Sequence, residues 1–172
     1  VENIHIVSFV PDKKEPVQEQ WVSRVFRILQ IESKGQSVLW DLSSGVKKVK
    51  HPGTDLVEIT PVSEDKIAEI EAKISGYLGL VPFYDVSRIP PDAKWGPVTD
   101  EGLQSAPEGT QVYDLIWEEK AYDGSLSAKK WRVFADPQTS LPQRTEFYEK
   151  LPGESEYTLR LIKIVEYINE SK

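Results

Sequence analysis

Four short segments in the last third of the chain have the composition of β-strands and are separated by turn sequences. They are Gln111–Glu119, Leu126–Ala135, Gln143–Lys150 and Glu156–Ile168. Each is rich in Trp, Tyr, Phe, Val, Ile or Thr, which fit a pleated, half-buried surface. Asp123-Gly124 has the residues of a tight hairpin, and proline-containing turns follow the next two segments. Because consecutive hairpins build an antiparallel sheet without long crossovers, we expect a four-stranded meander over 111–168.

The first sixty residues predict six further strands at nearly regular spacing, with turn residues between them. The segments are Asn3–Val10, Val17–Arg24, Val25–Glu32, Ser37–Leu42, Val46–Lys50 and Asp55–Thr60. We expect Val25–Glu32 to be buried on both sides because it is more apolar than the segment before it. The lysine-rich run 47–51 predicts a solvated sheet edge, since lysines on edges oppose sheet-to-sheet association.

One helix is predicted over Ser63–Tyr77, where apolar residues recur at spacings of three and four. Ser63 is a candidate N-cap, and the acidic residues after it complement the positive end of the helix. The stripe of apolar residues predicts docking against the sheet. The proline-rich segment 80–110 predicts an irregular connection, with a second short helix expected within Leu78–Ile89.

Composition indicates one domain spanning residues 1–172, with an ordinary apolar fraction of 39%. The net charge of −7 opposes nonspecific nucleic-acid binding, which depends on clustered Lys and Arg. The chain has no cysteine, which excludes disulfides and thiolate sites, and no apolar run of the roughly 20 residues that cross a bilayer. It begins at Val1 without a signal-like segment, so we expect a trimmed part of a longer precursor.

The sequence gives no positive support for catalysis, a metal site or a cofactor. Its two histidines, His5 and His51, have no partner at metal-ligand spacing. There is no Gly-x-Ser-x-Gly elbow and no glycine-rich phosphate loop. The neighbouring carboxylates Glu118 and Glu119 are expected on opposite faces of a strand, as are Glu146 and Glu149. We therefore predict that the protein is not an enzyme.

Large apolar side chains on both faces of several predicted strands leave two interpretations open. One is a sheet packed on both sides by ordinary core. The other is a concave sheet whose inner wall is an apolar ligand cavity. For that cavity the candidate lining residues are Phe26, Leu39, Trp117, Trp131 and Phe147, each of which equally fits plain core.

The order of strands, helical insertion and final meander resembles the bacterial periplasmic lipoprotein-carrier (LolA-like) superfamily. Trp21-Val22 leading to Phe26-Arg27 carries part of the resemblance. The segment 131–146 carries more, because Trp-Arg-Val followed by Asp-Pro-Gln-Thr-Ser-Leu-Pro-Gln-Arg is similar to the family's hairpin signature, with Ser140 where glycine is common. The family's N-terminal helix has no counterpart here, and Arg27 is the nearest candidate for the arginine that latches the carrier's lid.

The resemblance implies a strongly curved antiparallel sheet of about ten strands, an incomplete β-barrel of the α+β class covered by one or two helices. Strands would span 3–60, the helix and proline-rich lid 61–110, and the meander 111–168. The implied function is noncatalytic binding of an apolar ligand, acyl chain or lipidated protein in the bacterial envelope, in the periplasm or otherwise outside the cytoplasm. The alternatives are a sensor or regulatory domain of an anti-sigma-factor-like protein, which binds an envelope regulatory protein, and a small curved-sheet enzyme.

Overall fold

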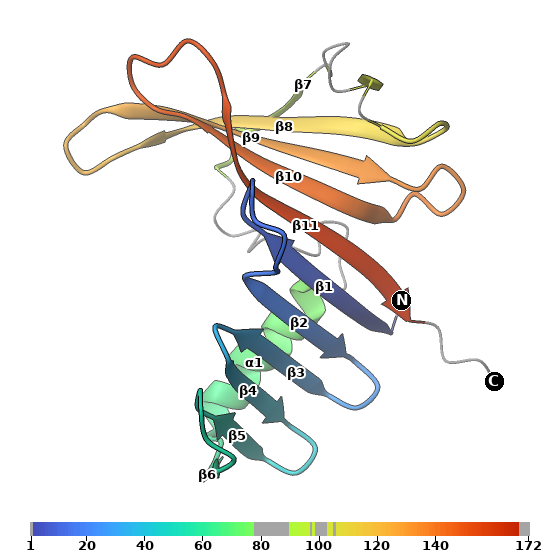
Figure 1. The fold of residues 1–172 in the computed structure, drawn as a ribbon, viewed down its shortest axis with the longest axis vertical. Helices are drawn as coiled ribbons and strands as arrows, with labels where there is room; N and C mark the ends of the chain where they lie inside the picture. Colours follow the sequence, from blue (N-terminus) through green and yellow to red (C-terminus); the bar gives the residue numbers. More distant parts are fainter. Residues whose placement is uncertain (1, 78–89, 97, 99–102, 105, 169–172) are drawn as a thin grey trace. The chain divides into compact units, whose positions relative to one another are not determined.

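The chain is folded mainly as an antiparallel sheet in the computed structural model, which describes residues 2–77, 90–96, 98, 103–104 and 106–168. The sheet has eleven strands in the order β6-β5-β4-β3-β2-β1-β11-β10-β9-β8-β7. The elements shown in Figure 1 are β1 (Asn3–Phe9), β2 (Gln18–Ser23), β3 (Ile28–Ser33), β4 (Gln36–Asp41), β5 (Val46–Lys50), β6 (Val57–Pro61), α1 (Glu64–Tyr77), β7 (Lys94–Gly96), β8 (Gln111–Lys120), β9 (Leu126–Ala135), β10 (Pro142–Lys150) and β11 (Thr158–Ile168). The predicted sheet with a helix is confirmed, with eleven strands in place of about ten.

The chain divides into two compact units. Unit 1 comprises Val1–Phe9, Lys14–Asp85 and Val165–Lys172, and unit 2 comprises Val10–Lys13 and Val86–Ile164. Strands β1 to β6, helix α1 and the end of β11 belong to unit 1, whereas β7 to β10 and most of β11 belong to unit 2. The single domain expected over 1–172 stays a prediction.

Unit 1 buries one face of a sheet of consecutive hairpins against α1. Ile4 of β1 lies opposite Val22 of β2, which lies opposite Leu29 of β3, and all three side chains are buried. Helix α1 contacts β2 and β3, as Figure 1 shows, and its Ile70 and Ile74 are also buried. The spacing of four residues puts both isoleucines on one side of the helix. The predicted docking of the helix on the sheet is confirmed.

The prediction that Val25–Glu32 is a strand buried on both sides is wrong, because β3 begins only at Ile28 and Leu29 is its one buried residue. Residues 24–27 form the turn between β2 and β3, and Val25 and Phe26 are about half exposed. The Phe26 N–H donates to the Ser23 hydroxyl at 3.1 Å, and Arg27 has a φ of 52°. A hairpin needs such a left-handed residue to reverse the chain, and that local geometry overrides the apolar character of the segment.

Two further expectations concern the middle of the sequence. The lysine-rich β5 is not a sheet edge, because β6 pairs along it and is itself the outermost strand. The proline-rich segment contributes a short edge strand, β7, that the sequence did not predict. The second helix expected within Leu78–Ile89 lies outside the described residues.

The turn between β9 and β10 explains the sequence signature that carries the family resemblance. One carboxylate oxygen of Asp136 accepts hydrogen bonds from the N–H groups of Gln138 at 2.9 Å and Thr139 at 2.8 Å. The bonds from Thr139 and its neighbours hold the pKa of Asp136 below its usual range. Ser140 has a φ of 57°, a left-handed conformation that glycine adopts more readily. The signature is thus a backbone requirement of this turn.

Truncating the helix side of the core tests this packing. We expect Ile70→Ala to reduce the free energy of unfolding by about 2–5 kcal/mol, because it leaves a cavity at a side chain only 1% exposed. Urea denaturation followed by circular dichroism measures the change. The control is Ser75→Ala at an exposed position of the same helix, which should change stability by less than about 0.5 kcal/mol. Equal losses in the two variants would contradict the proposed packing of α1.

Candidate functional site

Unit 2 gathers large apolar side chains on one face of β8, β9 and β10. Leu115 lies opposite Trp131, and Trp131 lies opposite Phe147, so these three form one row across the strands. Trp117 belongs to the same face because it follows Leu115 by two residues. Its ring lies 6.4 Å from that of Phe147. With Val133 these residues form the aromatic face: Leu115, Trp117, Trp131, Val133 and Phe147. Trp117 and Trp131 are 5% and 3% exposed.

Charged side chains flank the aromatic face along the strand direction. At one end, the Lys129 ammonium forms an ion pair with the Glu149 carboxylate, and it lies 5.9 Å from the Phe147 ring centre. The Lys129 ammonium, together with Arg160, holds the pKa of Glu149 below its usual range. At the other end, Lys163 of β11 lies opposite Thr145, which lies opposite Val133. The face therefore has an ion pair at one end, and Thr145 and Lys163 in the row of Val133.

Lys163 and Thr145 are unusual polar groups for such a face. Burial lowers the pKa of Lys163 to about 8, because the charged ammonium is poorly solvated there. Thr145 is 1% exposed, and its hydroxyl has no hydrogen-bond partner among the described residues. A buried hydroxyl without a partner is costly unless something supplies the missing bond. Together the two groups can receive the negatively charged or hydrogen-bonding end of a ligand.

The structure brings together three of the five predicted lining residues. Trp117, Trp131 and Phe147 share the aromatic face of unit 2. Leu39 lies in unit 1, on β4 opposite Gln30 and Lys48, on the sheet face that α1 does not cover. Phe26 also lies in unit 1, at the turn after β2. The prediction that these residues bind a ligand stays a prediction.

Phe26 contributes to a small apolar pocket in unit 1. The pocket has a volume of about 190 Å³ and is lined by Asn3, Ile4, Trp21, Val22, Ser23, Phe26, Ile28 and Ile168. Asn3 is 9% exposed, and its side-chain oxygen is buried and accepts no hydrogen bond from the described residues. Since a cavity of about 150 Å³ can hold benzene, this pocket has room for one short apolar group.

The opposite face of unit 2 carries a buried ion pair that sequence reasoning missed. Arg132 donates two hydrogen bonds to Asp114, both of 2.8 Å, in the bidentate arrangement that favours guanidinium–carboxylate pairing. The two side chains are 6% and 3% exposed. The hydrogen bonds to Asp114 raise the pKa of Arg132. The cross-strand register could have revealed the pair, since the two residues lie directly opposite each other.

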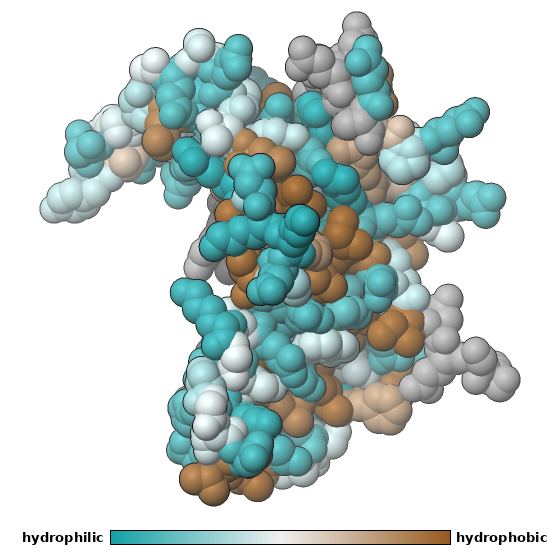
Figure 2. Space-filling view, viewed as in Figure 1, coloured by the Kyte–Doolittle hydropathy of each residue, from teal (hydrophilic) through white to brown (hydrophobic). Residues whose placement is uncertain are grey.

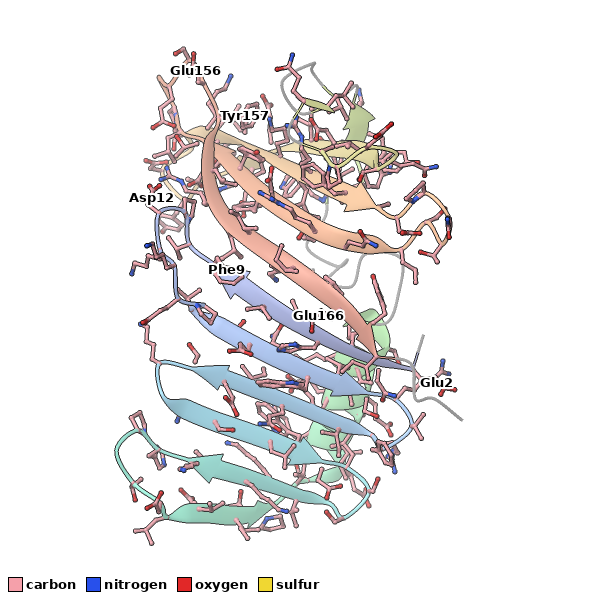
Figure 3. All side chains as sticks on the ribbon, turned by 45° about the vertical axis from the view of Figure 1, so that its right-hand side comes forward. Glu2, Phe9, Asp12, Glu156, Tyr157 and Glu166 are labelled. Carbon is pink, nitrogen blue, oxygen red and sulfur yellow. The ribbon has the colours of Figure 1, made fainter. Side chains whose placement is uncertain are left out.

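Other charged groups on this face are also held by neighbours. Arg144 and the Tyr148 hydroxyl both donate to the buried Glu146. The Lys130 ammonium lies 4.3 Å from the ring centre of Tyr148 and 4.7 Å from that of Tyr157, which Figure 3 labels just before β11. Burial and the hydrogen bond to Glu146 raise the pKa of Tyr148. These contacts make the face a structural network of ion pairs and cation–π contacts.

His5 of unit 1 lies at the centre of a polar cluster that the sequence did not predict. Its two ring nitrogens lie 3.0 Å from Glu19 and 3.1 Å from Glu166, which Figure 3 labels on β11. The ring stacks on Trp21 with 4.7 Å between centroids. His5 thus joins β2 and the end of β11 through its two carboxylate neighbours and its stacking on Trp21.

Comparison with known proteins assigns no family, since no protein-family model and no curated protein matches the chain. Within the described residues, no three His, Cys, Asp or Glu side chains are arranged to hold a metal ion. No helix in the same part of the chain is long and apolar enough to span a bilayer. The resemblance to the lipoprotein carriers stays a prediction.

The buried ion pair gives a stability prediction. Replacing Asp114 by Asn leaves the Arg132 charge without its partner, and we expect a loss of about 3–5 kcal/mol in unfolding free energy. The double variant Asp114→Leu with Arg132→Met removes both charges and should be less destabilised than Asp114→Asn. Chemical denaturation of the wild type, the single variants Asp114→Leu and Arg132→Met, and the double variant measures this coupling. Additive losses would show that the two side chains do not stabilise each other.

Lys163 gives a prediction for the pH dependence of stability. Its pKa is about 8 in the folded chain and about 10.4 in an unfolded one, so the unfolded state binds more protons between these values. Stability should therefore rise as the pH increases from about 8 to about 10.4, by an amount on the order of 2–3 kcal/mol from this lysine.

Lys163→Met removes the titrating group and provides the comparison. Denaturation midpoints of wild type and variant should converge as the pH is raised through this window, with the variant more stable at pH 7. A constant difference between the two proteins from pH 7 to pH 10.5 would contradict the burial of the Lys163 ammonium.

Proposed function

We propose that this chain is a noncatalytic binding protein that holds a carboxylate-headed acyl chain on the aromatic face of unit 2. The observation that carries the proposal is the position of Trp117, Trp131 and Phe147 on one face, with Lys163 and Thr145 at its end. The aromatic side chains supply apolar contact area to the acyl chain, worth roughly 25 cal/mol per Å² before the costs of binding.

The polar end of the face supports a ligand with an acidic head group. A carboxylate beside Lys163 would be attracted by the ammonium charge and would accept a hydrogen bond from the Thr145 hydroxyl, which has no partner among the described residues. Trp117 and Trp131 are almost fully buried, so the ligand has to displace whatever covers the aromatic face. In a lipoprotein carrier, the ligand displaces a lid in the same way. The ion pair between Arg27 and Glu71 of α1 supports Arg27 as the candidate for the arginine that latches the lid in this family.

Several carboxylates of unit 2 support a binding role over catalysis, because their oxygens are already engaged in ion pairs and hydrogen bonds. Glu149 is held by Lys129, Asp114 by Arg132, and Glu146 by Arg144 and Tyr148. Carboxylates engaged in this way are poorly suited to general acid–base work. The strongly curved half-barrel and a place in the bacterial envelope belong to the same proposal and rest on the resemblance.

Ligand binding can be tested with a long-chain fatty acid and the fatty alcohol of equal length. We expect the acid to change tryptophan fluorescence and, at about 100 times its Kd, to stabilise the fold by about 2.7 kcal/mol. That stabilisation corresponds to a rise in Tm of roughly 5–10 °C for a chain of this size. No response to either ligand at saturation would overturn the proposal.

The head-group contact is tested by Lys163→Met. This variant should bind the fatty acid more weakly and the alcohol equally well, because only the acid uses the ammonium. Lys150→Met, on the opposite face, is the matched control and should leave both affinities unchanged. Affinity of the wild type for the acid should fall above about pH 8, where Lys163 loses its proton.

A regulatory interaction domain is the second candidate, and the pocket at Phe26 favours it. Its walls are mainly apolar, which suits an apolar side chain of a protein partner. Short peptides ending in Phe or Leu should then bind wild type and bind Phe26→Ala at least tenfold more weakly. Val25→Ala in the same turn is the control. Peptide affinities that do not change in Phe26→Ala would exclude this pocket.

A further inference from the structure

The outermost strand of unit 1 exposes apolar side chains together with a free backbone edge. Among the described strands, β6 pairs only with β5 and is the last strand of the sheet. Leu56, just before the strand, is 80% exposed, and Val57 and Ile59 within it are 49% and 60% exposed. Figure 2 shows apolar surface at the β6 end of unit 1. An open, apolar edge of this kind readily pairs with another strand.

The hydrogen bonds of the β5–β6 hairpin show which backbone groups face outward. The Val62 N–H donates to the Gly45 carbonyl at 2.9 Å, so even-numbered residues of this segment bond to β5. In an antiparallel pair, alternate residues direct their N–H and C=O to opposite sides. Val57 and Ile59 therefore present both groups outward, whereas Pro61 presents a carbonyl and has no N–H.

We propose that β6 pairs with β6 of a second copy of this chain, antiparallel and about a two-fold axis at Ile59. In this register Ile59 lies opposite Ile59 of the second copy and exchanges both backbone hydrogen bonds with it. Val57 lies opposite Pro61, so the Val57 N–H donates to the proline carbonyl. The absent N–H of Pro61 limits the ladder to four bonds centred on the axis.

Side chains are self-complementary in the same register. Each exposed apolar side chain meets an apolar partner: Ile59 meets Ile59, Val57 meets Pro61, and Leu56 meets Val62. Glu58 lies opposite Thr60 and so avoids the like charge of a second Glu58. Lys47 lies opposite Thr60 within its own chain, so it comes into the same row as Glu58 of the second copy. Charge and hydrophobicity thus favour a second copy as the occupant of this edge.

A two-fold pairing also closes the association. Each copy uses its own β6 edge, so the edge is fully covered in a dimer and cannot recruit a third copy. The other end of the sheet is β7, which has only three residues. The association is independent of the ligand proposed above, because β6 belongs to unit 1 and the aromatic face belongs to unit 2.

Sedimentation velocity over a range of concentrations tests the dimer. The mass should rise from 19.6 kDa toward twice that value as the concentration increases. Ile59→Lys puts two ammonium groups together at the axis and should keep the chain monomeric. Tyr122→Lys, at a fully exposed turn residue, is the matched control and should dimerise like wild type. A wild type that stays monomeric at all concentrations, or an Ile59→Lys variant that dimerises equally, overturns the proposal.

Cysteine cross-linking tests the register, because the natural chain contains no cysteine. Across the axis, the Cα atoms of residue 59 should lie about 5.5 Å apart, within the range of a disulfide. The Cα atoms of residue 60 should lie about 8 Å apart, beyond that range. Mild oxidation should therefore cross-link Ile59→Cys rapidly and Thr60→Cys poorly. Equal cross-linking of the two variants, or faster cross-linking of Thr60→Cys, would overturn this register.

Discussion

The alternation of side chains along paired strands is the constraint on which this structure depends. A shift of one residue in any hairpin would exchange the faces of a whole strand, so the turns have to fix the register. The turn between β3 and β4 shows how this is achieved. Lys34 and Gly35 have φ angles of 51° and 76°, as the two central residues of a type I′ turn require. Correct register then places Ile4, Val22 and Leu29 together beneath α1.

Register also determines which charges can be buried. Arg132 is tolerated inside unit 2 because the residue opposite it is Asp114, and the pair satisfies both groups with two hydrogen bonds. Lys163 lies opposite Thr145 instead, and burial lowers its pKa to about 8. Arg132 therefore belongs to a structural ion pair, whereas the proposed head-group site combines Lys163 with the Thr145 hydroxyl, which has no hydrogen-bond partner among the described residues.

The two proposed interactions involve different parts of the sheet. Ligand binding would use a face, where large side chains from three strands combine their apolar area. Dimer formation would use an edge, where the outward backbone groups of β6 have no partner strand among the described residues. Pro61, which lacks an N–H, limits the number of hydrogen bonds at this edge. Faces and edges are physically independent, because side chains stand perpendicular to the sheet and backbone hydrogen bonds lie within it. Either activity could therefore change without the other.

The amino-acid sequence by itself determined the local elements: β9 at Leu126–Ala135 and β5 at Val46–Lys50 have the predicted bounds, and α1 begins one residue after the predicted start. Composition and spacing suffice there because strand alternation and helix periodicity are local properties. The sequence also grouped Trp117, Trp131 and Phe147 as candidates. Only the tertiary structure decided that they share a face, that Phe26 lies in a turn, and that Asp114 meets Arg132. Those facts depend on which strands pair and in what register, and pairing between distant segments leaves little trace in the periodicity of either one.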